Sequence, residues 1–170
     1  MIRIARKEDI DQIMTIVNET IEDLTAEGNY QWDETYPTAD HFLYDIQNNN
    51  LYIIESEDKV AGFICINQEE DEAYKTVNWR LDQPAIVLHR FAIKRDKMGQ
   101  GLGTKLVEFA IRFSQNRGLN YVKVDTNVKN KRMNEFFKKL GFVFVGQIVL
   151  RNVKDPFNCY DYIVETKDEA

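Results

Sequence analysis

The chain has 170 residues, a formal net charge of −6 and two cysteines. This length predicts one domain with a core of its own, and the acidic balance argues against nucleic acid or an anionic membrane as a general partner, because such binders carry basic surfaces. The N-terminus lacks a signal-peptide apolar region, no run reaches the ~20 apolar residues of a membrane span, and neither Cys65 nor Cys159 fits a disulfide or metal pattern. We therefore expect a cytoplasmic protein that binds no metal.

The first half of the chain predicts two helices and three strands. Apolar residues recur at steps of three and four between Ile10 and Leu24, as on one face of a helix. Two apolar runs on either side of a polar turn indicate a β-hairpin. In chain order, the expected elements are a strand at Ile2–Ala5, a helix that ends near Gly28, a loop at Tyr30–Pro37 rich in aromatic and acidic residues, a helix that Thr38 or Asp40 caps and that runs through Gln47, strands at Leu51–Glu55 and Val60–Asn67, and a polar stretch at residues 69–84 of undecided structure.

The second half predicts a strand–helix–strand unit, a further helix and an antiparallel strand pair. The strands Ile86–Ile93 and Tyr121–Thr126 flank a helix that Gly118 stops, so a right-handed crossover should make these two strands parallel. The next helix ends at Gly141, a residue type that favours the position after a helix. The final antiparallel pair is expected at Phe142–Leu150 and Tyr160–Thr166.

Three glycines at alternate positions, Gly99, Gly101 and Gly103, lie between the strand Ile86–Ile93 and the helix that follows it. Glycine permits positive φ and a close approach of the backbone to a ligand, and the N–H groups at a helix N-terminus attract phosphate. The spacing excludes the dinucleotide fingerprint, and Gly103-Thr-Lys has the wrong order for a nucleotide-triphosphate loop. The pattern favours a phosphorylated small molecule over the alternative, a flexible turn without a ligand.

Basic residues gather beside this loop and at the start of the next helix. Either group alone is explained by solvated surface side chains, but the two together support an anionic ligand. The first group comprises Lys94, Arg95, Lys97 and Lys105, and the second comprises Lys129, Lys131 and Arg132.

The glycine loop and the segment Asn130–Phe142 together resemble the GCN5-related N-acetyltransferase (GNAT) family, and the resemblance covers nearly the whole chain. It implies an α/β (α+β) fold with a mixed, mostly antiparallel sheet of about seven strands, a central parallel βαβ crossover and flanking helices. It also implies a single GNAT domain at residues 1–166 and a frayed tail at 167–170. The family's acyl-CoA motif Arg/Gln-x-x-Gly-x-Gly/Ala falls on Met98, Gly101 and Gly103, and its signature of an Asn before a helix ending in Lys-x-Gly-Phe falls on Asn130, Lys139, Gly141 and Phe142.

The resemblance implies acetyl-CoA as the cosubstrate. In the family, N–H groups of the glycine loop hold the pyrophosphate, and the preceding strand splays from its neighbour and offers backbone groups to pantetheine. A backbone N–H on that strand also polarises the thioester carbonyl. By this resemblance, the expected donor-binding residues are Phe91, Ala92, Ile93, Lys97, Met98, Gly99, Gln100, Gly101, Leu102, Gly103, Thr104, Asn130, Met133, Phe137 and Lys139.

Two positions depart from the family pattern. Met98 stands where the motif has Arg or Gln and offers the phosphates neither charge nor amide, so backbone N–H groups and Lys97 are expected to carry that contact. Phe137 stands where many members have a tyrosine that protonates the leaving thiolate, and Tyr160 is a candidate substitute. A thiol of pKa ~8.5 also leaves as thiolate or takes a proton from water, so Phe137 is expected to slow the reaction without forbidding it.

Transfer to an amine requires a neutral nucleophile, because an alkyl ammonium of pKa ~10.4 must first lose a proton to a base or a water chain. His89 on the strand Ile86–Ile93 and the loop acids Asp33 and Glu34 are the candidate catalytic residues. The alternatives for them are a histidine hydrogen-bonded on the sheet and ordinary loop acids. Asp125 is expected to be a structural hydrogen-bonding group at a strand end.

Large aromatic side chains are the candidates for the wall of an acceptor pocket. Trp32 and Tyr36 belong to the loop Tyr30–Pro37, and Trp79 belongs to the polar stretch before the strand Ile86–Ile93. The alternative is that these side chains belong to the core, as large aromatics usually do.

These residues favour an acetyl-CoA-dependent N-acetyltransferase, which transfers the acetyl group to a primary amine of a small molecule or peptide by direct nucleophilic attack. An alternative, to which Met98 and Phe137 point, is an acetyl-CoA-binding sensor or degenerate GNAT domain with little turnover. A third is an α/β interaction domain without a ligand. Dimers are common in the family, so a homodimer is a further expectation.

Overall fold

The computed structural model describes residues 1–165, and the tail predicted at 167–170 lies outside them. The strands are β1 (Ile2–Ile4), β2 (Leu51–Ser56), β3 (Lys59–Asn67), β4 (Ile86–Ile93), β5 (Tyr121–Asn127), β6 (Val143–Ile148) and β7 (Phe157–Ile163). The helices are α1 (Ile10–Ala26), α2 (Ala39–Gln47), α3 (Leu102–Asn116) and α4 (Lys131–Lys139), with short 3-10 helices η1 (Lys7–Asp9), η2 (Glu72–Thr76) and η3 (Arg95–Lys97).

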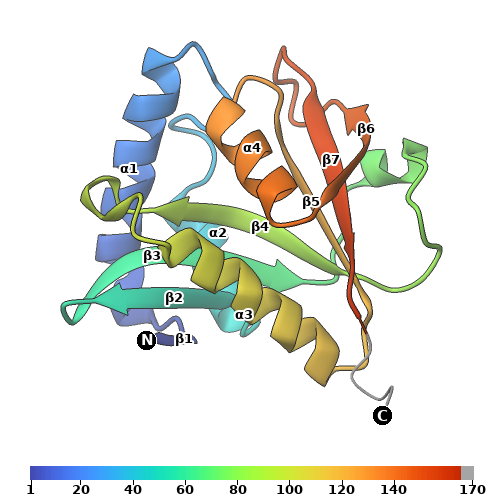
Figure 1. Cartoon of the computed structure of the whole chain (residues 1–170). Helices are drawn as coiled ribbons and strands as arrows, with labels where there is room; N and C mark the ends of the chain where they lie inside the picture. The colour runs from blue at the N-terminus through green and yellow to red at the C-terminus, as the bar shows by residue number, and fades with distance from the viewer. Residues whose placement is uncertain (166–170) are drawn as a thin grey trace. The chain divides into compact units, whose positions relative to one another are not determined.

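The strands form a seven-stranded mixed sheet in the order β1-β2-β3-β4-β5-β7-β6 (Figure 1). The β4/β5 pair is parallel, whereas β1/β2, β2/β3, β5/β7 and β6/β7 are antiparallel. The sheet and its flanking helices confirm the fold class that the resemblance implies, including the parallel strand–helix–strand unit. Among residues 1–165, no helix combines the length and the apolar character needed to cross a bilayer.

The chain divides into two compact units, and β4 and α3 each contribute residues to both. The first unit comprises Met1–Ile66 and His89–Glu108, and the second comprises Asn67–Leu88 and the residues from Phe109 onward.

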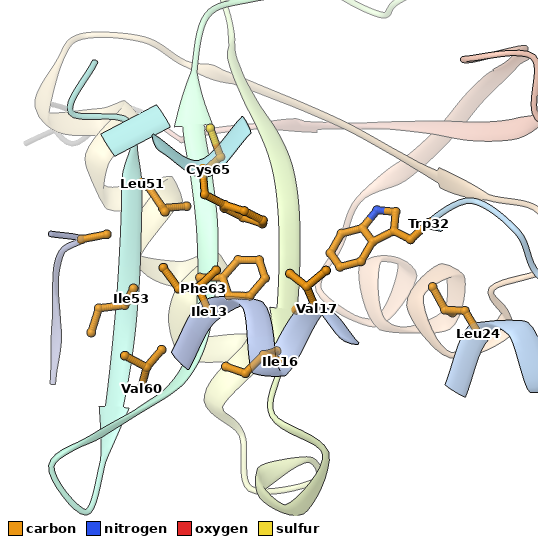
Figure 2. Packing of buried hydrophobic residues seen from close by; sticks show 13 residues of the cluster. Ile13, Ile16, Val17, Leu24, Trp32, Leu51, Ile53, Val60, Phe63 and Cys65 are labelled. Carbon is orange, nitrogen blue, oxygen red and sulfur yellow. The ribbon is translucent and has the colours of Figure 1, made fainter. Parts of the chain in front are cut away.

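Helix α1 buries one face in the core of the first unit. Ile13, Ile16 and Val17, at the i, i+3 and i+4 spacing of one helical face, are at most 1% exposed. They share a cluster with Leu51 on β2 and Phe63 on β3 (Figure 2). Each such side chain contributes about 1.5–3 kcal/mol on burial, so this cluster fixes the strands that support β4.

Strands β3 and β4 approach each other closely at Gly62. A Cβ built on Gly62 would lie 2.6 Å from Ile93 Cδ1 and 2.9 Å from the Ala92 carbonyl oxygen. The Lys94 N–H also donates to the Ala61 carbonyl, at 2.7 Å. The backbone of Ala92 therefore has no room to move toward β3, which fixes the strand segment predicted to hold pantetheine.

Gly62→Ala is expected to lower the free energy of unfolding by about 1–3 kcal/mol, because the added methyl group displaces backbone and not only the end of a side chain. Gly146→Ala is the matched control, since its Cβ would meet only the Val77 side chain, at 3.2 Å. Urea denaturation measures both. Equal stability of the two variants would contradict the proposed close approach.

The second unit places β7 between β5 and β6. The strand predicted at Tyr160–Thr166 is observed at Phe157–Ile163, because the polar Asn158 and Asp161 are part of the strand and have hydrogen-bond partners there. The C-terminal end of α4 agrees with the prediction, since Gly141 follows it with a φ of +95°. A buried cluster of Tyr74, Val87, Ile148, Leu150, Phe157 and Cys159 forms the core of this unit.

Candidate functional site

The glycine loop leads from the end of β4 through η3 to the start of α3 (Figure 1), and this segment belongs to the first unit. Gly99 and Gly101 have φ values of +80° and +81°, and a Cβ on either would project into open space. The Lys105 N–H donates to the Gly101 carbonyl at 3.1 Å and so starts the hydrogen-bond ladder of α3. N–H groups in the first turn of any helix lack a partner within the helix, and the dipole is positive there. The loop and helix start therefore form a backbone cradle suited to an anion.

Gly103 differs from the other two glycines, because it lies inside α3 and requires no positive φ. Leu102, which begins the helix, is buried, whereas Met98 and Gln100 are exposed beside the cradle. Thr104 lies in the first helical turn and is half-buried. The predicted loop residues thus lie together, with the positive-φ pair at 99 and 101 setting the course of the backbone.

The basic side chains before the loop have acidic partners. Lys97 Nζ lies 3.2 Å from Glu57, and Arg95 Nη2 lies 3.1 Å from Asp23 on α1. Lys94 is paired with Glu19, also on α1, at 3.7 Å. This cluster was predicted to meet phosphates. Ion pairs compensate the charge of Lys94, Arg95 and Lys97, whereas its fourth member, Lys105, is exposed in the first turn of α3.

In the second unit, Asn130 caps the helix that carries the second motif. Its side-chain oxygen accepts a hydrogen bond from the Met133 N–H at 3.1 Å. Asn134, one turn later, is buried, and its amide donates to the carbonyls of Asn127 and Asn130 at 3.0 and 2.8 Å. Sequence reasoning missed Asn134, although an asparagine on the apolar side of a helix is a signal for a buried hydrogen-bond network.

Phe137 is 1% exposed and belongs to an aromatic cluster with Phe142 and Tyr160. The Tyr160 hydroxyl donates to the Asn134 side-chain oxygen at 2.6 Å, and burial raises the pKa of this tyrosine. The candidate substitute acid is therefore a fully buried side chain whose proton is held by Asn134. Lys139, by contrast, lies exposed at the end of α4.

The loop between α1 and α2, in the first unit, carries four predicted site residues: Trp32, Asp33, Glu34 and Tyr36. Trp32 is 6% exposed and lies in the same core cluster as Val17 (Figure 2), which is the position of a packing side chain. Asp33 Oδ1 accepts from both the N–H and the hydroxyl of Thr35, at 2.8 and 2.6 Å. Glu34 is exposed at the tip of the loop. Of the two loop acids, Glu34 is thus the one whose carboxylate faces solvent.

His89 is a residue of β4, and Tyr36 contacts that strand through its hydroxyl. The Tyr36 hydroxyl accepts a hydrogen bond from Arg90 Nη1 at 3.0 Å, and its ring contacts His41 edge-on at 4.9 Å. His89 is half-buried on β4, one residue before Arg90. Arg90 was not among the predicted site residues, because its partners are distant in sequence.

Trp79 lies in the second unit against η2. Its indole N–H donates to the Tyr74 carbonyl at 2.8 Å, and the Lys123 ammonium lies 4.5 Å from its ring centre. The Tyr74 hydroxyl donates to Asp125 at 2.5 Å, and burial raises the pKa of that carboxyl. Asp125 thus has the structural hydrogen bond that the sequence predicted. Within the described residues, no group of three or more His, Cys, Asp or Glu side chains could hold a metal ion.

Comparisons with known proteins agree with these features. The chain is 24% identical to an uncharacterized N-acetyltransferase, YesJ, of Bacillus subtilis, over 82% of this chain and 79% of the relative. It is similar to the crystal structure of a GNAT-family acetyltransferase from Streptococcus agalactiae, with a TM-score of 0.87, 25% identity and coverage of 98% and 96% of the two chains. It shares the fold of yncA, described as a putative acetyltransferase from Salmonella typhimurium with its cofactor acetyl-CoA, with a TM-score of 0.71, 16% identity and coverage of 97% and 94%.

The family model described as "Acetyltransferase (GNAT) family" matches residues 16–142, a range that includes the glycine loop, α4 and Phe142. This range is most of the chain. The chain therefore belongs to the GNAT family of acetyl-CoA-dependent N-acetyltransferases.

Proposed function

We propose that this chain, acting as one GNAT domain, transfers the acetyl group of acetyl-CoA to a primary amine of a small molecule or peptide. The observation that carries the proposal is the backbone cradle: Gly99 and Gly101 in positive φ, followed directly by the start of α3. Donors supplied by backbone suit a pyrophosphate, and they compensate for Met98, which has no charge or amide to offer. The predicted donor contacts from Asn130 to Lys139 remain part of this proposal.

The chemistry that we propose is direct attack by the neutral amine on the thioester carbonyl. Backbone N–H groups in the segment Phe91–Ile93 would stabilise the developing oxyanion, and close contact with Gly62 holds that segment in place. Glu34, exposed on its loop, or His89, half-buried on β4, would receive the proton that the ammonium must lose. Phe137 supplies no proton, so CoA leaves as a thiolate or takes a proton from water.

A thermal-shift titration tests donor binding. Acetyl-CoA at a hundredfold excess over its Kd should stabilise the fold by about 2.7 kcal/mol, which for a chain of this size raises Tm by roughly 5–10 °C. Acetate at the same concentration is the control and should leave Tm unchanged. No stabilisation at millimolar acetyl-CoA would contradict the proposal.

Thiol release then tests transfer. We expect at least one amine to accelerate release of free CoA from acetyl-CoA, in a panel comprising a peptide with a free N-terminus, a lysine peptide with a blocked N-terminus, a polyamine and benzylamine. Mass spectrometry should show the acetylated amine as the product. Stabilisation by acetyl-CoA without acceleration by any amine would favour the alternative, a sensor, to which the burial of Phe137 and the engaged Tyr160 hydroxyl point.

Two further expectations belong to this proposal. A cytoplasmic location follows from the sequence analysis and from acetyl-CoA as a cosubstrate. A homodimer is the expected assembly by resemblance to the family.

A further inference from the structure

Arg90 has an unusual backbone conformation in the middle of β4. Its φ is +39°, whereas the other non-glycine residues with positive φ in the described chain all lie in turns. A long side chain adopts this region only where its surroundings fix it, and such residues concentrate at functional sites. The irregularity lies directly before Phe91–Ile93, the segment proposed to hold the thioester.

The Arg90 guanidinium is fixed by residues from three other elements of the first unit. It forms a bidentate pair with Asp45 on α2, with Nε–Oδ2 and Nη2–Oδ1 distances of 2.6 and 2.7 Å. Nη1 donates to the Tyr36 hydroxyl at 3.0 Å, and Nη2 lies 3.7 Å from Cys65 Sγ on β3. Asp45 is fully buried and Arg90 is 12% exposed, so water screens these contacts little.

The contact with Tyr36 extends to the loop that carries the candidate acceptor acids. Tyr36 and Asp33 form a two-way backbone bridge, with N–O distances of 2.9 and 3.2 Å. Glu34 and Thr35 lie between them, and Asp33 holds Thr35 through its carboxylate. A shift of the Tyr36 side chain would therefore move Asp33 and Glu34 with it.

We infer that Arg90 is a positioning residue that fixes the acceptor loop relative to the donor strand. Its backbone shapes β4 just before the segment proposed to hold the thioester, and its side chain holds the loop Asp33–Tyr36 through the Tyr36 hydroxyl. The inference rests on the proposed transfer to an amine. A residue with this role governs how the amine is placed and leaves the anion cradle around Gly101 unaffected.

Tyr36→Phe is the least disruptive test, because it removes one hydroxyl and keeps the Arg90–Asp45 pair. With the amine of the panel that the wild type acetylates fastest, we expect kcat/KM for the amine to fall about tenfold, and KM for acetyl-CoA to stay within about twofold. Tyr30→Phe is the matched control, since Tyr30 belongs to the same loop and is exposed; it should retain wild-type kinetics. Arg90→Lys keeps the charge but loses the planar guanidinium, and it should lower kcat/KM for the amine at least as much as Tyr36→Phe does.

For the double variant Tyr36→Phe/Arg90→Lys, kcat/KM for the amine should be no more than about twofold lower than for Arg90→Lys alone, because both changes break the same contact. A KM for acetyl-CoA that rises in parallel, or a Tyr36→Phe variant equal to Tyr30→Phe, would overturn the inference.

A fluorescence measurement separates this inference from the proposed function. In a Trp79→Phe background, Trp32 is the remaining tryptophan and reports on the loop Tyr30–Pro37, to which Tyr36 also belongs. Tyr36→Phe and Arg90→Lys should increase acrylamide quenching of Trp32, and Tyr30→Phe should not. If the wild type acetylates no amine, the proposed function fails, but the quenching measurement still tests the loop contact. Unchanged quenching of Trp32 in Tyr36→Phe and Arg90→Lys would refute that contact.

Discussion

Gly101→Asp is expected to abolish acetyl-CoA binding, with an affinity loss of at least about a hundredfold. Aspartate tolerates positive φ better than most residues, so the backbone at φ +81° is retained and the added charge decides the result. Two like charges about 5 Å apart repel by roughly 3 kcal/mol at an effective dielectric constant of about 20, and a pyrophosphate carries more than one charge. Isothermal titration calorimetry with acetyl-CoA measures the loss.

Two controls separate charge from shape and from backbone strain. Gly101→Asn adds the same volume without the charge and should lose no more than about tenfold in affinity. Gly118→Asp places the same residue at a φ of +69°, again with open space around its Cβ, at the other end of α3. This variant should bind acetyl-CoA normally. Near-normal affinity of Gly101→Asp would show that the pyrophosphate is bound elsewhere.

Asp161→Asn is expected to lower the free energy of unfolding by about 2–4 kcal/mol. Asp161 is fully buried on β7. Its carboxylate accepts hydrogen bonds from the Arg80 backbone N–H at 3.1 Å, from Arg80 Nε at 2.7 Å and from the Tyr121 hydroxyl. The amide of an asparagine at this position would turn an N–H group toward Arg80 or Tyr121, which are themselves donors, and a hydrogen bond would be lost. The loss lies near or below the 3–5 kcal/mol typical of breaking a buried pair, since Arg80 is 38% exposed and can reach water.

Urea denaturation of the variant provides the measurement, and Asp155→Asn provides the comparison. Asp155 is paired with Lys129 at 3.2 Å near the surface of the same unit, where an ion pair contributes less than about 1 kcal/mol. Burial, with the hydrogen bond to Asp161, raises the pKa of Tyr121 to about 12. A loss of stability no larger than that of Asp155→Asn would show that Asp161 is replaceable.

Local sequence patterns were sufficient for the elements that depend on neighbouring residues. The apolar run of β4 gave its bounds at Ile86 and Ile93, and Gly141 ended α4 as expected. The glycine loop was also recognisable, because positive φ and helix initiation are both properties of a short segment.

Features that depend on partners distant in sequence could not be predicted in the same way. The pairing of Lys97 with Glu57, and of Arg95 with Asp23, joins residues 40 and 72 positions apart. Arg90 combines a positive φ with side-chain hydrogen bonds to Asp45 and Tyr36, and no pattern within β4 indicates either feature. The candidate acceptor residues depend on such contacts more than the glycine loop does, which explains why the conformation of the loop was the more predictable part.

The cradle at Gly99 and Gly101 has a consequence for how this chain tolerates mutation. Main-chain N–H groups are present whatever side chain a residue carries, so recognition by backbone depends on conformation and not on residue identity. Met98 illustrates this, since it replaces a polar motif residue beside glycines that keep their positive φ. Side chains around the loop can therefore be substituted and take on other roles, whereas substitution is restricted at Gly99 and Gly101, which set the path of the backbone.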